Sequence, residues 1–221
     1  MADSGRNHRS RRHYDPRQAD FLKQAYATLG TSELRNAVKL PQGEDLNEWL
    51  AVNVSDFFKQ VTMLYGTISD SCTIYTCPSM TAGPKFEYTW AENDQSILCT
   101  APEYIDYLFT SIQDELDDEN VFPSQIGKAF PSHFVKIVQT IVRRLFRVYA
   151  HIYHEHFELI KSLKSTEHLN TSFKHFMLFV QEFKLIDTAE LGPLHSLIQE
   201  LIPSMIPDYA INGTSSSSSQ S

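Results

Sequence analysis

The amino-acid sequence predicts an all-α fold, a helical bundle around one long central helix, with a single small β-hairpin. The central helix is predicted over residues 131–163, which contain no glycine and no proline after the first position. Their apolar side chains recur at three- and four-residue spacing for several turns, and they cover enough of the circumference for burial on more than one side. Only residues 86–100 show the alternation of apolar and polar residues that is typical of strands.

The composition is typical of one domain with a large core. Of the 221 residues, 42% are hydrophobic and 12% are aromatic, which is ample for a chain that folds alone. The formal net charge of −8 argues against general nucleic-acid binding and favours a basic protein partner. Three cysteines, an odd number, do not make a disulfide framework. There is no apolar run of about 18 residues and no apolar segment of a secretion signal, so we expect no transmembrane segment and a cytoplasmic or nuclear protein.

The two ends of the chain are predicted to be tails on either side of a helical domain at residues 18–208. Residues 1–17 lack apolar periodicity and carry five arginines, which predicts a disordered basic tail. This tail is read as solvated, with nuclear import or anion binding as the alternative. Residues 209–221 contain a serine run and are predicted to be a flexible tail.

Two short helices and one long amphipathic helix are predicted before residue 67. The short helices cover residues 16–29 and the segment from Ser32 onward, because Gly30 separates them. The amphipathic helix ends at Gly66. Its predicted core positions follow i, i+3, i+4 spacing: Leu46, Trp49, Leu50, Val54, Phe57, Phe58, Val61 and Leu64.

The other side of this amphipathic helix is acidic, with Glu44, Asp45, Glu48 and Asp56. Acidic residues in a first turn stabilise the positive end of the helix dipole, and this role alone would explain them. The alternative is an acidic face that binds a basic partner.

The predicted hairpin follows a loop rich in Ser, Thr, Pro and Gly that carries Cys72 and Cys77. Phe86, Tyr88 and Trp90 alternate with polar residues and predict the first strand. The second strand is expected within residues 97–100.

Three further helices are predicted, over residues 102–118, 170–186 and 187–202. The first ends in the acidic cluster 114–119, which is read as a solvated helix end. Asp187 and Glu190, three residues apart, resemble a capping box for the last helix.

Cys72 and Cys77 could form a zinc site with histidines at the end of the central helix. Zinc binds thiolate sulfur and imidazole nitrogen, and a Cys2His2 set fills its tetrahedral shell, so such a site is structural. Helical spacing favours His151 with His154, because His156 lies about 140° around from His151 on an ideal helix. The alternative is that the cysteines are small buried hydrophobes and the histidines ordinary polar residues.

The alternative function is a zinc-dependent hydrolase that uses His151, His154 and Glu155. A catalytic zinc needs an open coordination position and a base, and Glu155 could be that base. However, the HExxH spacing is absent, as are a nucleophile elbow, a phosphate loop and a dinucleotide-binding fingerprint. We therefore expect no enzymatic activity.

A cluster of three arginines, Arg143, Arg144 and Arg147, interrupts the apolar pattern of the central helix. Arg143 and Arg147 are four residues apart on one face, with Arg144 on the flank. Guanidinium groups bind phosphate oxygens in bidentate geometry, so the three could converge on a phosphorylated partner. The alternative interpretation is that these arginines form a solvated stripe and pair with nearby acidic residues.

Four long motifs resemble the Mob (Mps one binder) family of kinase activators, most closely its Hippo-pathway members. They are NEWLAVNVSDFF, LYGTISDSCTIYTCPSMTAGP, RRLFRVYAHIYHEHF and HLNTSFKHFMLFVQEFKLID, within residues 27–202. The resemblance implies a Mob-like helical domain with a structural zinc and no catalysis. It implies Cys72, Cys77, His151 and His156 as the zinc ligands, in place of His154.

The resemblance also implies a monomeric adaptor in Hippo or mitotic-exit-type signalling. Such proteins bind the basic N-terminal regulatory segment of NDR/LATS-type Ser/Thr kinases and dock phosphorylated Ste20-like kinases or scaffolds. By position, the kinase-binding residues would be Glu44, Glu48, Asp56 and His175, and the phosphopeptide-binding residues Arg143, Arg144 and Arg147.

The sequence departs from close relatives in two places. The segment AENDQSIL replaces a hairpin loop with a lysine pair, so one phosphate contact is not expected here. An N-terminal phosphorylatable threonine motif is missing, whereas the second phosphorylation site is present as Thr28.

Overall fold

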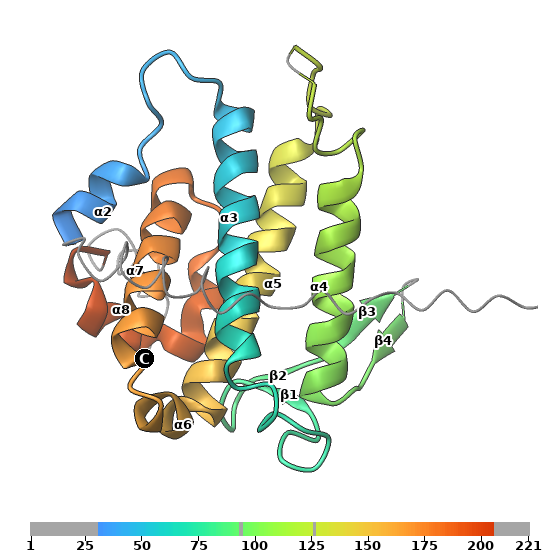
Figure 1. Cartoon of the computed structure of the whole chain (residues 1–221), viewed down its shortest axis with the longest axis vertical. Coiled ribbons are helices and arrows are strands. Elements are labelled where there is room, and N and C mark those ends of the chain that lie inside the picture. The colour runs from blue at the N-terminus through green and yellow to red at the C-terminus, as the bar shows by residue number, and fades with distance from the viewer. Residues whose placement is uncertain (1–30, 93–94, 126, 206–221) are drawn as a thin grey trace, which may run out of the picture.

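The computed structural model describes residues 31–92, 95–125 and 127–205 of the chain (Figure 1). The predicted tails, the helix expected at 16–29 and Thr28 lie outside these residues. Within them, helices dominate, and the all-α prediction is confirmed. None of the described helices is both long enough and apolar enough to cross a membrane.

The bundle is built on helix α5 (Phe134–Glu155), which lies behind α3 (Leu46–Gly66) and beside α4 (Ala101–Asp117) in Figure 1. Helix α7 (Thr166–Phe183) lies on the other side of α3. The predicted central role of α5 is confirmed, because its buried side chains cover most of its circumference: Phe134, Val138, Ile141, Val142, Leu145, Phe146, Val148, Tyr149, Ala150, His151 and Ile152.

A polar chain crosses the core and joins three of these helices. Tyr149 on α5 packs against Phe173 and Phe176 of α7, at ring-centroid distances of 5.3 and 5.1 Å. Its hydroxyl lies 2.6 Å from Ser172 Oγ, which donates to Gln60 Oε1 on α3 at 3.1 Å. Since each of these buried polar groups has a partner, the chain fixes how α5, α7 and α3 lie against one another.

The central helix is shorter than predicted. Helix α5 ends at Glu155, and α6 (Phe157–Ser162) continues the chain after a break at His156. The backbone of His156 leaves the helical region, with φ −124° and ψ 9°. The prediction of one helix to residue 163 was therefore wrong. Apolar periodicity continues through the break, so it carried no signal of this bend.

The strands form two short antiparallel pairs. The predicted hairpin is confirmed as β3 (Trp90–Glu92) with β4 (Gln95–Ile97), but its first strand begins at Trp90 and not at Phe86 as expected. Its second strand was expected within 97–100, but Thr100 instead caps α4 through a capping box with Glu103. A further pair, β1 (Met80–Thr81) with β2 (Glu87–Tyr88), was missed, because two-residue strands show no alternation.

The first and last parts of the described chain are short helices. Helix α2 (Thr31–Ala37) was predicted, and it packs against α7. The helix predicted over 187–202 is instead a 3-10 helix η1 (Thr188–Leu194) followed by α8 (His195–Leu201). A short 3-10 turn η2 (Pro203–Met205) comes after it. Pro193 lies inside η1 and has no N–H to donate. The predicted capping box was wrong, because the side chain of Asp187 makes no capping bond.

Candidate metal centre and binding surfaces

Four buried side chains, Cys72, Cys77, His151 and His156, converge where the loop after α3 meets the end of α5. Their ligand atoms all lie within 4.8 Å of one another. Cys72 Sγ is 3.4 Å from His151 Nε2, and Cys77 Sγ is 3.4 Å from His156 Nε2. Bond lengths of about 2.3 Å to sulfur and about 2.0 Å to nitrogen give nearly this sulfur–nitrogen separation in a tetrahedral zinc site. The donor set therefore fits Zn²⁺.

Neighbouring groups orient these donors. The Nδ1–H of His151 donates to the carbonyl oxygen of Thr81 at 2.8 Å, which leaves Nε2 facing the thiol of Cys72. The backbone N–H groups of Cys72 and Cys77 donate to Ile68 and Thr73, at 3.1 and 2.8 Å, so the loop holds both sulfurs in place. Strand β1 and the loop thus prepare the site before any ligand binds.

Burial shapes the protonation of the cluster. It lowers the pKa of His156 to about 4 and also lowers that of His151, so both imidazoles are neutral at pH 7, as metal binding requires. Burial also raises the pKa of Cys72 to about 12, although a hydrogen bond with Tyr65 lowers this pKa by favouring the thiolate. A cation among the four donors would reverse the effect on the thiol.

His154 lies outside this cluster, so the pairing of His151 with His154 that helical spacing favoured was wrong. His154 is exposed, and its Nε2–H donates to the carbonyl oxygen of Pro193 at 2.8 Å. Glu155 accepts a hydrogen bond from Thr81 Oγ1 at 3.1 Å. The bend at His156 brings in the fourth donor, so all four positions of a tetrahedral zinc shell would be filled by protein. Such a shell has no open position for the hydrolase considered above.

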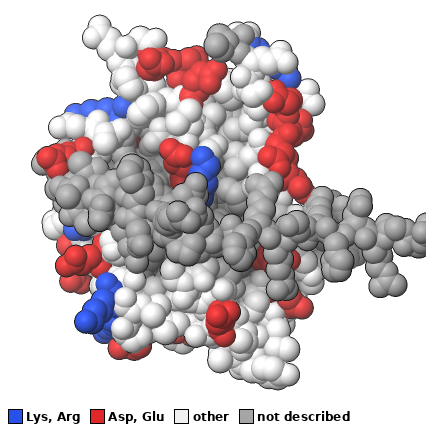
Figure 2. Space-filling model, viewed as in Figure 1, with Lys and Arg blue, Asp and Glu red and all other residues white. Residues whose placement is uncertain are grey.

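The acidic residues Glu44, Glu48 and Asp56 are exposed on the first half of α3 and the loop before it. Figure 2 shows carboxylates gathered over this start of α3. Asp45 has a different role, because its carboxylate caps the helix by accepting from the N–H groups of Asn47 and Glu48, at 2.8 and 3.1 Å. Glu48 and Asp56 are eight residues apart, or about 12 Å along the helix.

His175 on α7 lies at the same α3–α7 surface. Its ring is 4.9 Å from that of Phe57, and burial lowers its pKa to about 4 despite the nearby charge of Asp56. Two exposed apolar side chains lie among the acids, Leu46 at 41% and Val52 at 56% exposed. Leu46 was predicted to be in the core, which was wrong. We name Glu44, Leu46, Glu48, Val52 and Asp56 the α3 face.

Arg143 and Arg147 line one pocket of about 170 Å³, together with Tyr88 and Glu190. Arg147 donates to Tyr104 Oη at 2.8 Å, and its guanidinium lies 4.9 Å from the ring centroid of Tyr88. Arg143 Nη1 is 3.6 Å from Glu190 Oε1. Glu190 was not predicted in this role, because its spacing from Asp187 suggested a helix cap instead.

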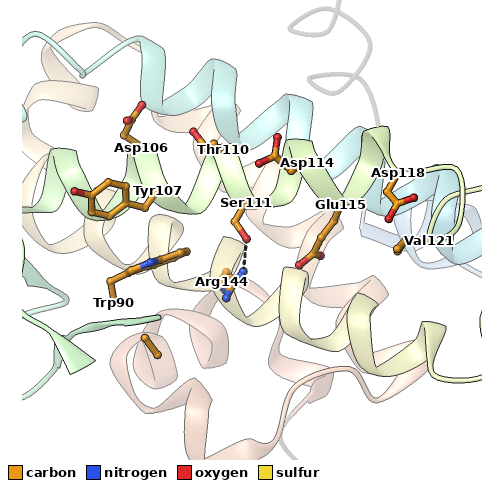
Figure 3. A pocket seen from close by; sticks show the side chains of 11 residues that line it. Trp90, Asp106, Tyr107, Thr110, Ser111, Asp114, Glu115, Asp118, Val121 and Arg144 are labelled. Atoms are coloured by element: carbon orange, nitrogen blue, oxygen red, sulfur yellow. Dashed lines mark hydrogen bonds between the residues drawn. The ribbon is translucent and has the colours of Figure 1, made fainter. Parts of the chain in front are cut away.

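Arg144 lines a different groove, along α4 (Figure 3). Its Nη1 donates to Ser111 Oγ at 2.9 Å, and its guanidinium lies 4.9 Å from the ring centroid of Trp90. The structure thus brings together two of the three arginines, and it places the third against aromatic and acidic residues.

Comparison with known proteins confirms the family resemblance that the four sequence motifs indicated. The model of the Mob1/phocein family matches residues 26–194. The chain is 60% identical over 185 residues to MOB kinase activator-like 1 homolog A from Dictyostelium discoideum, covering 82% of this chain and 87% of that protein. It is 57% identical over 187 residues to MOB kinase activator-like 1B from Arabidopsis thaliana, covering 83% and 87%. MOB kinase activator-like 1A from Medicago sativa subsp. falcata is 54% identical over 187 residues, with the same coverage.

Proposed function

Since this chain belongs to the Mob1/phocein family, whose kinase activators are regulators and not enzymes, we propose that it is a non-catalytic adaptor and co-activator of NDR/LATS-type Ser/Thr kinases. It works as a cytoplasmic or nuclear monomer in Hippo or mitotic-exit-type signalling. The α3 face is the observation that carries this proposal.

The α3 face suits the basic N-terminal regulatory segment of such a kinase. Glu44, Glu48 and Asp56 supply exposed negative charge, and Val52, 56% exposed, offers apolar contact between them. A helix that carries basic residues beside an apolar stripe would match both features. The only described cation paired with these acids is Lys59, 3.2 Å from Asp56, and both side chains are so exposed that this pair is weak.

The Cys2His2 cluster holds a structural Zn²⁺ in this proposal. Cys72 and Cys77 come from the loop after α3, whereas His151 and His156 come from the end of α5. A closed site of this kind contributes folding free energy and fixes its ligands. Zinc would thus hold the loop against α5 and, through it, the last turn of α3.

The pocket of Arg143 and Arg147 docks a phosphorylated Ste20-like kinase or scaffold in this proposal. Two guanidinium groups at one opening can bind the oxygens of a phosphothreonine in bidentate geometry. Glu190 lies beside Arg143 until a phosphate displaces it. Arg144 lines the neighbouring groove, and its part in phosphate binding stays a prediction.

A titration of the full chain with the basic N-terminal segment of an NDR/LATS-type kinase tests the main proposal. At low salt we expect binding, and at moderate salt we expect weaker binding because the charges of the α3 face are exposed and screened. Binding that does not change with salt would refute a charge-based interface at the α3 face.

A further inference from the structure

A second acidic surface lies on α4, apart from the α3 face. Asp106, Asp114 and the C-cap residue Asp118 follow one another at multiples of four residues, so they lie in one row along α4. Tyr107, Ser111 and Glu115 form the neighbouring row. An open groove of about 780 Å³ lies along these rows (Figure 3). Its other wall is formed by Trp90 on β3 and Arg144 on α5. We name it the α4 groove, and Figure 2 shows carboxylates along this side of the molecule.

The α4 groove has an excess of negative charge. Four carboxylates line it, those of Asp106, Asp114, Glu115 and Asp118, against the single guanidinium of Arg144. Arg144 is already engaged by the hydroxyl of Ser111 and the ring of Trp90. Within the described parts of the chain, no cation lies within 4 Å of any of the four carboxylates. The groove therefore offers negative charge that the described residues do not neutralise.

Glu115 gives a second, independent indication of a ligand. Its carboxylate points toward Arg144 across the groove (Figure 3), but its Oε2 atom is sealed from solvent and has no hydrogen-bond partner among the described residues. A buried carboxylate oxygen without a donor is costly, and native structures rarely leave one unexplained. Burial also raises the pKa of Glu115, with the charge of Arg144 opposing the change. The side chain of Glu115 as a whole is only partly buried and lines the groove, so a turn of its carboxylate would bring this oxygen to a cationic hydrogen-bond donor there.

We infer that the α4 groove binds a basic segment of a partner protein, with two or three Arg or Lys residues. The spacing of the carboxylates favours an extended conformation of the bound segment. Asp114 and Asp118 are about 6 Å apart along the helix, and Asp106 and Asp118 about 18 Å apart. Alternate side chains of an extended peptide are separated by about 6.6 Å. An extended segment with basic residues at alternate positions therefore meets this row of acids.

Aromatic side chains at one end of the groove suit the same ligand. The rings of Trp90 and Tyr107 are 5.9 Å apart, and Tyr107 is 44% exposed. Arg144 already stacks on Trp90, so the ring of Tyr107 is the accessible one. Its face can take a second guanidinium by a cation–π contact. This site is independent of the proposed kinase interface, because it uses α4 and not α3.

The two tryptophans of the chain allow the two acidic surfaces to be told apart. Trp90 lines the α4 groove, whereas the Nε1–H of Trp49, on α3, donates to the carbonyl oxygen of Val38 at 3.1 Å. We would titrate the ¹⁵N-labelled full chain with a capped peptide of three arginines alternating with glycines, and follow both indole resonances. We expect the Trp90 resonance to move and the Trp49 resonance to stay. Movement of Trp49 alone, or no binding, would overturn the proposal.

Variants that replace groove carboxylates by amides test whether these charges bind the probe. In Asp114→Asn with Asp118→Asn we expect the Kd for the probe to rise at least fivefold. The matched control is Asp70→Asn with Asp117→Asn, which removes the same charge from exposed residues that do not line the groove, and its Kd should change less than twofold. If the Kd rose equally in the two variants, the effect would come from net charge alone, and a specific site in the α4 groove would be refuted.

The basic residues of this chain's own N-terminus are the competing occupant. Replacing Arg9, Arg11 and Arg12 by Gln in the full chain separates the two. If a partner segment is the ligand, the Trp90 resonance without probe and the Kd for the probe both stay unchanged. A shifted Trp90 resonance with at least threefold tighter probe binding would assign the groove to the chain's own N-terminus instead.

Discussion

The Nη1 atom of Arg143 lies 3.6 Å from Oε1 of Glu190, in the pocket that Arg147 also lines. An internal carboxylate therefore lies where the proposed function expects a phosphate. Both side chains are partly exposed, at 40% and 34%, so the pair contributes less than about 1 kcal/mol. Such a contact is weak enough for a phosphate with two charges to displace.

Replacing Glu190 by Gln should strengthen phosphopeptide binding. The variant keeps the side-chain shape but removes the competing negative charge, so we expect the Kd for a phosphothreonine peptide to fall about two- to fivefold, the range that a surface ion pair allows. Isothermal titration of the full chain measures it, with Glu200→Gln as the control at an exposed acid on α8. Weaker binding in Glu190→Gln would instead make Glu190 a support for Arg143.

Discrimination for phosphate should depend on Arg143 and Arg147. The double change Arg143→Ala with Arg147→Ala removes both guanidinium groups from the pocket, so phosphorylated and unphosphorylated peptides should bind with equal Kd. Arg144→Ala is the informative comparison, because Arg144 lines the α4 groove and not this pocket. If Arg144→Ala alone lost the preference for phosphate, the site would have to be moved toward α4.

Loss of the metal site should destabilise the fold. Cys77→Ser removes one of the four donors, and we expect about 4 kcal/mol of lost stability, which corresponds to a Tm lower by roughly 8–16 °C. Metal content and thermal unfolding are measured on the same sample. The control is Cys99→Ser, because Cys99 is half-buried and outside the cluster. A Cys77→Ser protein that kept its Tm would show that the four side chains hold no stabilising ion.

Stability should fall in mild acid because of His175. Burial lowers its folded pKa to about 4, from 6.5 in the unfolded chain. Above pH 6.5 the imidazole is neutral in both states, and below it the unfolded state binds the extra proton. The free energy of unfolding therefore decreases from pH 6.5 toward pH 4, by up to about 3 kcal/mol.

The variant His175→Phe isolates this effect. It keeps a ring against Phe57 but cannot be protonated. Urea unfolding at several pH values should give a shallower acid dependence than the wild-type chain shows. The metal site is present in both proteins, so its own acid sensitivity cancels in the difference. Identical pH profiles would contradict the assignment.

The bundle could be predicted from the sequence because it follows from local apolar spacing. The periodicity of α3, α4 and α5 marks their buried sides directly. The bend at His156 could not be derived in this way, because it is a tertiary feature: the residue turns out of the helix to meet Cys77, 79 positions away in the chain. Only the family resemblance selected His156 over His154.

The binding surfaces could be predicted in part. Arg143, Arg144 and Arg147 are adjacent on one helix, but β2 and β3 place the ring of Tyr88 beside Arg147 and the ring of Trp90 beside Arg144. Helical spacing cannot tell which strand each arginine will meet. The acids of α4 were read as a solvated helix end. Their groove exists only because Trp90 and Arg144 form its other wall.

The role of the α3 face is decided by the activity of an NDR/LATS-type kinase with the wild-type chain and with Glu48→Lys plus Asp56→Lys. We predict that the wild-type chain raises the activity, more strongly at low salt, and that the variant fails to do so. A control with Asp70→Lys and Glu200→Lys, which reverses two exposed acids outside the α3 face, should activate like the wild type. Full activation by the α3 variant would contradict the account, because the kinase would then be bound elsewhere.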